Sequence, residues 1–132
     1  MPETVRGAQA MIAQMAPRLD GSGPWCFVDV TPDRAPELLG AALATFREAE
    51  GVSAIVPGHL APEGAPHFAR ITLEVYSDLE ACGLTAAVAS ALAAAGIACN
   101  MVAALHHDHL FVPWAEADAA LQTLRRLSEK AR

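Results

Sequence analysis

Residues 70–114 read RITLEVYSDLEACGLTAAVASALAAAGIACNMVAALHHDHLFVPW, and this stretch decides the fold. Apolar and polar residues alternate through residues 69–77, which predicts a strand with one buried face. Residues 84–95 are rich in alanine, and Leu84, Val88 and Leu92 recur at helical spacing. Gly96 fits the left-handed position that often follows the last residue of a helix. The first half of the stretch therefore predicts a strand followed by a helix.

The second half of the stretch returns to strand-like sequence. We expect strands at residues 97–105 and 109–112, with a turn between them at His107 and Asp108. Pro113 and Trp114 then open a last helix over residues 115–126. The order strand, helix, strand, strand, helix is typical of an α+β domain.

No charged side chain occurs between Glu80 and His106, although a surface helix normally keeps one charged face. A membrane span is not favoured, because alanine is only weakly apolar and Leu, Ile, Phe and Val are sparse in this run. We therefore expect the helix to pack on two sides, against its own sheet and against a second helix. That second helix belongs either to the same chain or to a symmetry-related copy.

The N-terminal half is predicted with less detail. It contains a helix over residues 3–16, a strand over residues 25–30 and a helix over residues 35–43. A hairpin follows, with its turn at Glu50 and Gly51. The proline- and glycine-bearing stretch up to Pro66 separates two halves, residues 1–66 and residues 67–132.

Composition excludes several classes of protein. The chain has 132 residues and a net charge of −6, which argues against a nucleic-acid partner. The three cysteines show no CxxC spacing, so neither a disulfide framework nor a zinc knuckle is indicated. The N-terminal segment lacks the pattern of a signal peptide, which predicts a cytoplasmic protein without a membrane partner. No motif indicates a cofactor.

The stretch from residue 70 to residue 114 resembles the ACT-domain family, and residues 46–51 of the first half look similar to it as well. The segments that carry the resemblance are Ser77–Glu80, Gly83–Ala86, Gly96–Ile97, Asn100, His107–His109 and Val112–Trp114. The resemblance implies a ferredoxin-like βαββαβ fold, with an antiparallel sheet, helices on one face and two related halves. It also implies non-catalytic binding of an amino acid or a similar metabolite. The sequence departs from the family in one respect, because it predicts six strands and two complete units need eight.

The loop that leads into the alanine-rich helix is the first candidate site. The free N–H groups at a helix N-terminus suit a carboxylate, and Asp78 and Glu80 suit an ammonium group. Gly83 would let a ligand approach the backbone, and Asn100 offers both a donor and an acceptor. With the family resemblance, the predicted ligand-binding residues are Ser77, Asp78, Leu79, Glu80, Cys82, Gly83, Leu84 and Asn100. The alternative is a plain connection in which Asp78 caps the helix and Asn100 is satisfied by a turn.

Two other groups of residues are alternatives to this site. His106 and His109 pair across a two-residue hairpin in a metal hypothesis, with His59, His67 or Asp108 as a third ligand. The simpler interpretation is a polar hairpin tip, because neighbouring strand residues point to opposite faces. Cys82, in a loop before a helix, is a candidate thiol nucleophile assisted by one of the tip histidines. We predict neither a metal site nor a catalytic residue.

The sequence thus predicts a regulatory or sensing protein that binds a small metabolite, most simply an amino acid, and forms a homodimer. One alternative is a pure assembly domain, in which the alanine-rich face makes a dimer and no ligand exists. The other is a small enzyme that uses Cys82 or the histidine hairpin.

Overall fold

A computed structural model describes residues 7–75, 79 and 82–132. The chain forms two compact units, which we call unit 1 and unit 2. Unit 1 combines residues 1–21 with residues 69–132, and unit 2 spans residues 22–68. The predicted division between residues 66 and 67 lies two residues before the boundary of unit 2, and the N-terminal segment belongs to unit 1 rather than to the first half.

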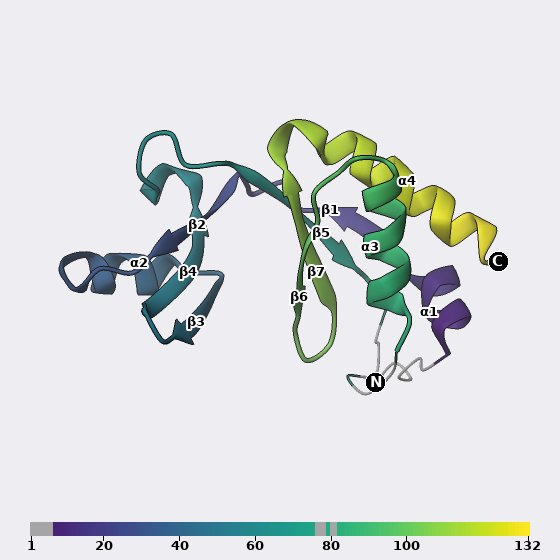
Figure 1. The fold of residues 1–132 in the computed structure, drawn as a ribbon, viewed down its shortest axis with the longest axis horizontal. Helices are drawn as coiled ribbons and strands as arrows, with labels where there is room; N and C mark the ends of the chain where they lie inside the picture. Colours follow the sequence, from purple (N-terminus) through teal and green to yellow (C-terminus); the bar gives the residue numbers. More distant parts are fainter. Residues whose placement is uncertain (1–6, 76–78, 80–81) are drawn as a thin grey trace. The chain divides into compact units, whose positions relative to one another are not determined.

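Unit 1 is built from helices and an antiparallel sheet, as the sequence predicted (Figure 1). Its helices are α1 (Ala8–Gln14), α3 (Leu84–Ala94) and α4 (Ala117–Lys130), the last preceded by the 3₁₀ turn η3 (Trp114–Glu116). Its strands are β1 (Pro17–Leu19), β5 (Phe68–Leu73), β6 (Asn100–Ala103) and β7 (Asp108–Pro113). The strands lie in the order β1-β5-β7-β6.

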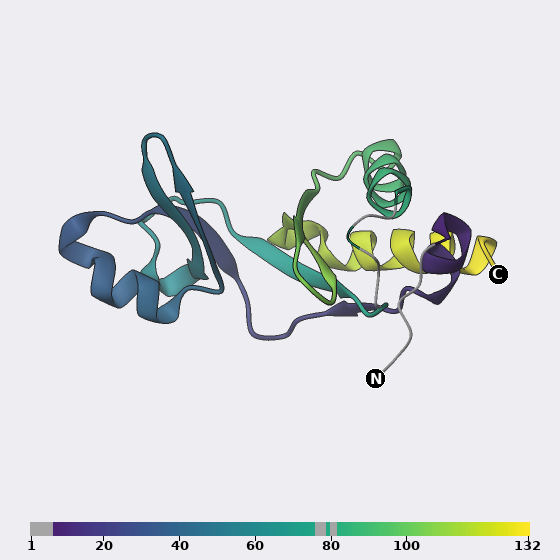
Figure 2. The ribbon, with the colours of Figure 1, turned by 90° about the horizontal axis from the view of Figure 1, so that it is seen from below.

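The core of unit 1 lies between this sheet and its helices. Alternate residues of β5 and β7 point toward the helices, namely Ala69, Ile71, Leu73, Leu110 and Val112. They pack against Met11 and Met15 from the N-terminal segment, Leu84, Val88 and Leu92 of α3, and Leu124 of α4. Figure 2 shows α3 and α4 on the same side of β1 and β5. The helices therefore cover one face of the sheet, as predicted.

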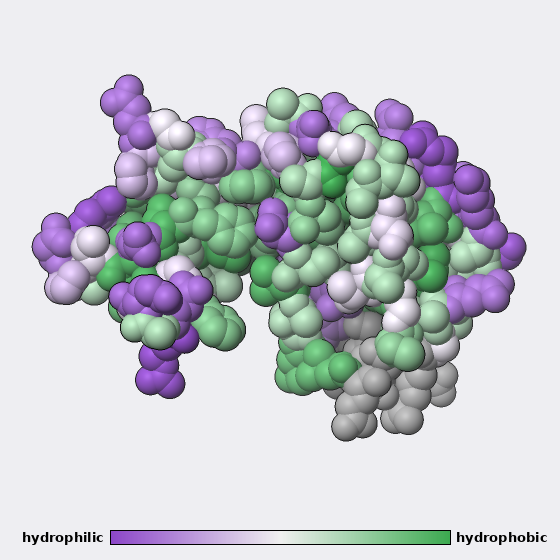
Figure 3. All heavy atoms as spheres, in the orientation of Figure 1, coloured by the Kyte–Doolittle hydropathy of each residue, from purple (hydrophilic) through white to green (hydrophobic). Residues whose placement is uncertain are grey.

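Helix α3 packs on two sides within the chain. Its inner face meets the sheet core, and its flanks contact α4 and α1. This confirms the prediction that the uncharged helix meets a second helix. An outer face is still exposed, formed by Thr85, Ala86, Ser90, Ala93 and Ala94. In Figure 3 the surface over α3 is pale green and white, whereas the purple of charged side chains covers the outer side of α4.

Unit 2 is a smaller antiparallel sheet with one helix. Its elements are β2 (Trp25–Asp29), η1 (Pro32–Arg34), α2 (Ala35–Ala41), β3 (Ala44–Glu48), β4 (Gly51–Pro57) and η2 (Gly58–Leu60). The strands lie in the order β3-β4-β2, and Trp25 at the start of β2 also pairs with Phe68. Leu38 of α2 packs on Ala54 and Val56 of β4 to form a small core. Unit 2 therefore buries only a few large side chains.

Some predicted boundaries shift. The described residues contain seven strands rather than six, because β1 is too short for its alternation to be recognised. Its first residue, Pro17, directly follows the helix predicted over residues 3–16. The hairpin between β3 and β4 pairs Glu48 with Gly51, so its turn is Ala49–Glu50, one residue earlier than predicted. Among the described residues, every helix is too short or too polar to cross a bilayer.

Candidate functional site

The loop before α3 holds most of the predicted ligand-binding residues. Ser77, Asp78 and Glu80 lie outside the described residues. Leu79 and Cys82 are exposed, whereas Leu84 is buried in the core of unit 1. Because the residue that precedes α3 is a glycine, it has no side chain to cap the first N–H groups of the helix.

Gly83 packs closely against the start of α1. Its φ of 111° is strained for other residues, and a Cβ added to it would lie 2.6 Å from the Cβ of Ala8. The space in the direction of a Cβ is therefore filled by Ala8, which gives this glycine a reason in helix packing. Its role in ligand approach stays a prediction.

Asn100 lies at the far end of its strand from this loop. Thr72, near the end of β5, bonds His109, near the start of β7, through Oγ1 and Nδ1 atoms 3.0 Å apart. The loop after β5 therefore leaves the sheet where β7 begins. Asn100 pairs instead with Phe111, and its side-chain NH₂ donates to the Phe111 carbonyl at 3.3 Å. Among the described residues, Asn100 therefore lies beside Phe111 rather than beside the end of β5, where the loop begins.

The histidine hairpin has a different register from the one predicted. His109 pairs with Val102 and Asp108 pairs with Ala103, so the turn spans residues 104–107. The pairing of His106 with His109 across a two-residue turn is therefore wrong. Among the described residues, no group of three or more His, Cys, Asp or Glu side chains is placed to hold a metal ion.

His109 lies in a partly buried, positively charged setting. Burial lowers the pKa of His109, the nearby Arg70 guanidinium lowers it further, and His107 and Arg18 act in the same direction against Asp108. The ring is therefore neutral near pH 7. Its Nδ1 atom forms a hydrogen bond with the Thr72 hydroxyl. Arg70 itself is paired with Asp20, with Nη2 and Oδ2 2.7 Å apart. This ion pair joins β5 to the segment after β1.

The three cysteines differ in access. Cys82 is exposed, Cys99 is half-buried and Cys26 is fully buried. Burial raises the pKa of the Cys99 and Cys26 thiols, so both are protonated at neutral pH. Only Cys82 has the exposure that a nucleophile needs.

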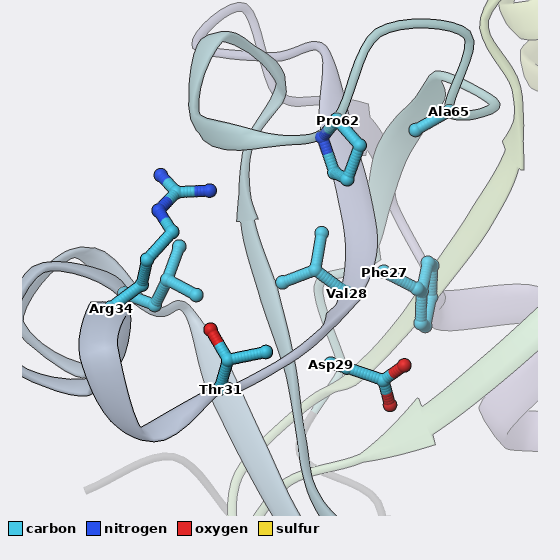
Figure 4. Close-up of a pocket in the computed structure, with 8 residues that line it drawn as sticks. Phe27, Val28, Asp29, Thr31, Arg34, Pro62 and Ala65 are labelled. Carbon is cyan, nitrogen blue, oxygen red and sulfur yellow. The ribbon is translucent and has the colours of Figure 1, made fainter.

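Unit 2 contains a cavity that the sequence did not predict (Figure 4). It has a volume of about 410 Å³, which is in the range of small-molecule sites. Most of its wall is apolar, and three polar side chains join it. The lining residues are Phe27, Val28, Asp29, Thr31, Arg34, Leu38, Pro62 and Ala65.

The charged residues of this cavity differ in their bonding. The Arg34 Nε and Nη2 groups both donate to Glu37 Oε1, and Nη1 donates to the Leu60 carbonyl at 2.9 Å. Two of the five N–H donors of Arg34 are left over. The Asp29 carboxylate has no hydrogen-bond or ion-pair partner among the described residues. The cavity therefore offers a guanidinium that is oriented by Glu37 and keeps two N–H donors, together with the Asp29 carboxylate, beside apolar walls.

Sequence reasoning missed this cavity for an identifiable reason. The segment that contains Thr31 and Arg34 falls between the strand predicted over residues 25–30 and the helix predicted over residues 35–43, and it carries no recognisable motif. The alternation in β2 does place Phe27 and Asp29 on one face, and this was the available signal. The contact of Arg34 with Leu60 joins residues 26 positions apart and leaves no pattern in the sequence.

The chain is similar to known proteins in sequence and in fold. Residues 66–126 match the family model described as an ACT domain. A protein of unknown function from Vibrio cholerae, described as a possible transport protein, is 36% identical over 88% of this chain and 92% of its own, with a TM-score of 0.74. The ligand-free regulatory subunit of aspartate kinase from Thermus thermophilus is 13% identical, with a TM-score of 0.61 over 85% of this chain and 97% of its own.

A protein from Agrobacterium tumefaciens is 15% identical, with a TM-score of 0.63 over 80% of this chain and 84% of its own. At 13% and 15% identity, the likeness shows the fold alone. No curated protein matches the chain. The cavity of unit 2 lies outside the segment matched by the family model.

Proposed function

Because the chain belongs to the ACT-domain family, we propose that it is a non-catalytic regulatory protein that binds a small metabolite of the amino-acid class. ACT domains are regulatory ligand-binding domains in general, and the chain shares their fold. The amino-acid class and the position of the site are the specific parts of this proposal.

The cavity of unit 2 is the observation that carries the proposal. An amino acid has an ammonium group, a carboxylate and a carbon skeleton. The cavity combines the carboxylate of Asp29, which no described residue bonds, with the guanidinium of Arg34, beside the apolar Val28 and Leu38. Charge-assisted hydrogen bonds of this kind are stronger than neutral ones, and the apolar residues offer a surface for the carbon skeleton.

The loop before α3 is a second candidate site. The N–H groups at the start of α3 suit a carboxylate, and Asp78 supplies the opposite charge in the sequence prediction. Asn100 pairs with Phe111 and donates its side-chain NH₂ to the carbonyl of that residue. We propose that a site at this loop takes Asn100 from a second copy.

We propose that this second copy is present and that the protein is a homodimer. The outer face of α3 supports this, because its exposed residues are small and uncharged. Small residues allow two helices to approach closely. All three cysteines are free, which supports a location in the reducing cytoplasm.

The test is a thermal-shift screen of the full chain against the twenty amino acids and common nucleotides. An amino acid at a hundred times its dissociation constant should stabilise the protein by about 2.7 kcal/mol. Asp29→Asn should abolish the shift, whereas Asp33→Asn, an exposed acid outside the cavity wall, should retain it. A dimer that no compound stabilises would instead support a pure assembly domain.

A further inference from the structure

The two charged groups of the unit 2 cavity are held apart. Figure 4 shows the Asp29 carboxylate on one side of the Val28 side chain and the Arg34 guanidinium on the other. Asp29 and Val28 are neighbours in β2, so they project from opposite faces of the strand. The Arg34 guanidinium points away from Asp29, and no ion pair joins the two side chains.

Three hydrogen bonds hold Arg34 in its observed orientation. Its guanidinium donates two N–H groups to Glu37 Oε1 and a third N–H to the Leu60 carbonyl. The bond to Leu60 is made to the backbone, so turning the guanidinium toward Asp29 would break it. The anion-binding end of the cavity is therefore fixed at the junction of η1, α2 and η2.

The cation-binding end is shaped by an aromatic ring. Phe27 projects from the same face of β2 as Asp29, two residues away. Its ring packs edge-to-face on Phe68, with centroids 5.3 Å apart and an interplanar angle of 81°. A carboxylate beside an aromatic ring favours an ammonium group, because the ring attracts cations as well.

We infer that the cavity selects a linear amino acid whose ammonium group is separated from its carboxylate by several methylene groups. This inference rests on the proposed function and specifies its ligand. The carboxylate binds the two remaining N–H donors of Arg34, and the ammonium group binds Asp29. The methylene chain lies along Val28, Leu38 and Pro62. In an α-amino acid, a single carbon separates the two groups, so we expect its main-chain groups to engage one end of the cavity only.

The separation is measured with a series of amino acids that differ only in the number of methylene groups between the ammonium group and the carboxylate. Calorimetry on the full chain compares glycine, 3-aminopropanoate, 4-aminobutanoate, 5-aminopentanoate and 6-aminohexanoate. Affinity should rise along the series to an optimum at least tenfold tighter than glycine. Asp29→Asn and Arg34→Gln should each weaken the best ligand more than tenfold. The matched controls Asp33→Asn and Arg47→Gln, which are exposed and outside the cavity wall, should not.

Two ligands that each carry only one charged group test which residue binds the carboxylate and which binds the ammonium group. Arg34→Gln should weaken the binding of pentanoate, whereas Asp29→Asn should not. For pentylamine, Asp29→Asn should weaken binding and Arg34→Gln should not. If the affinity does not depend on the number of methylene groups in the ligand, or is highest for glycine, the inference is overturned while the proposed function stands. If neither this series nor the twenty amino acids bind, the proposed function fails as well. Melting temperatures of all variants identify any that do not fold, and Arg34→Lys then replaces Arg34→Gln.

Discussion

The Cβ of Ala8 lies 2.6 Å from the position that a Cβ on Gly83 would occupy, so the start of α1 packs directly on the residue before α3. This contact joins the N-terminal segment to the helix layer of unit 1. It also explains why a glycine stands at the start of α3, where the sequence suggested room for a ligand.

Gly83→Ala should destabilise the protein by two additive effects. The left-handed conformation costs an alanine about 1–2 kcal/mol, and overpacking against Ala8 adds about 1–3 kcal/mol. Gly96→Ala is the matched control, since Gly96 has a φ of 75° with open space around it. Urea unfolding measures both variants. Equal losses of unfolding free energy in the two variants would contradict the contact with Ala8. Adding Ala8→Gly to Gly83→Ala should recover part of the lost free energy.

His109 should make stability depend on pH. The pKa of His109 is lowered in the folded chain, chiefly by burial and then by Arg70, so the unfolded chain binds a proton more readily. The contribution to the free energy of unfolding is complete above the ordinary histidine pKa and is lost as the pH falls toward the lowered value. His109→Gln should flatten the pH profile of the urea midpoint between pH 5 and pH 7. The exposed His59→Gln should leave the wild-type slope, and an unchanged slope in His109→Gln would refute this role.

Much of unit 1 could be predicted from the sequence because its signals are local. Strict alternation identified β5, and the alanine-rich run ending at Gly96 identified α3. The features that failed depend on contacts between distant residues. The hairpin register that pairs His109 with Val102 and the bond from Arg34 to Leu60 are examples. The cavity of unit 2 was missed for the same reason, since its walls come from separate segments.

The thiols should react in the order of their exposure. Cys82 is exposed and should be alkylated by iodoacetamide first, with Cys99 slower and Cys26 protected until the protein unfolds. Burial raises the pKa of Cys99 and Cys26, which lowers the fraction of reactive thiolate at both positions. Mass spectrometry of timed samples measures the order. Early modification of Cys26 in the folded protein would contradict the packing of β2.

The homodimer should depend on the outer face of α3. Ala93 is exposed in the single chain, so Ala93→Glu should leave the fold of one subunit intact. In a dimer that uses this face, the new carboxylate would be buried without a partner and would shift the protein to monomer. Ala119→Glu, at an exposed alanine of α4, is the matched control. Sedimentation equilibrium measures the mass, and a wild-type monomer or a dimeric Ala93→Glu variant would refute this interface.

The central claim is that the cavity of unit 2 binds the ligand. A titration of the ¹⁵N-labelled full chain, followed by two-dimensional NMR, tests it most directly with the amino compound that gives the largest thermal shift. We predict saturable shifts of the amide signals of Phe27, Asp29, Thr31, Arg34 and Ala65, which line the cavity. Shifts confined to Leu79, Cys82–Leu84 and Asn100, with those of the cavity unchanged, would contradict the claim and move the site to the start of α3.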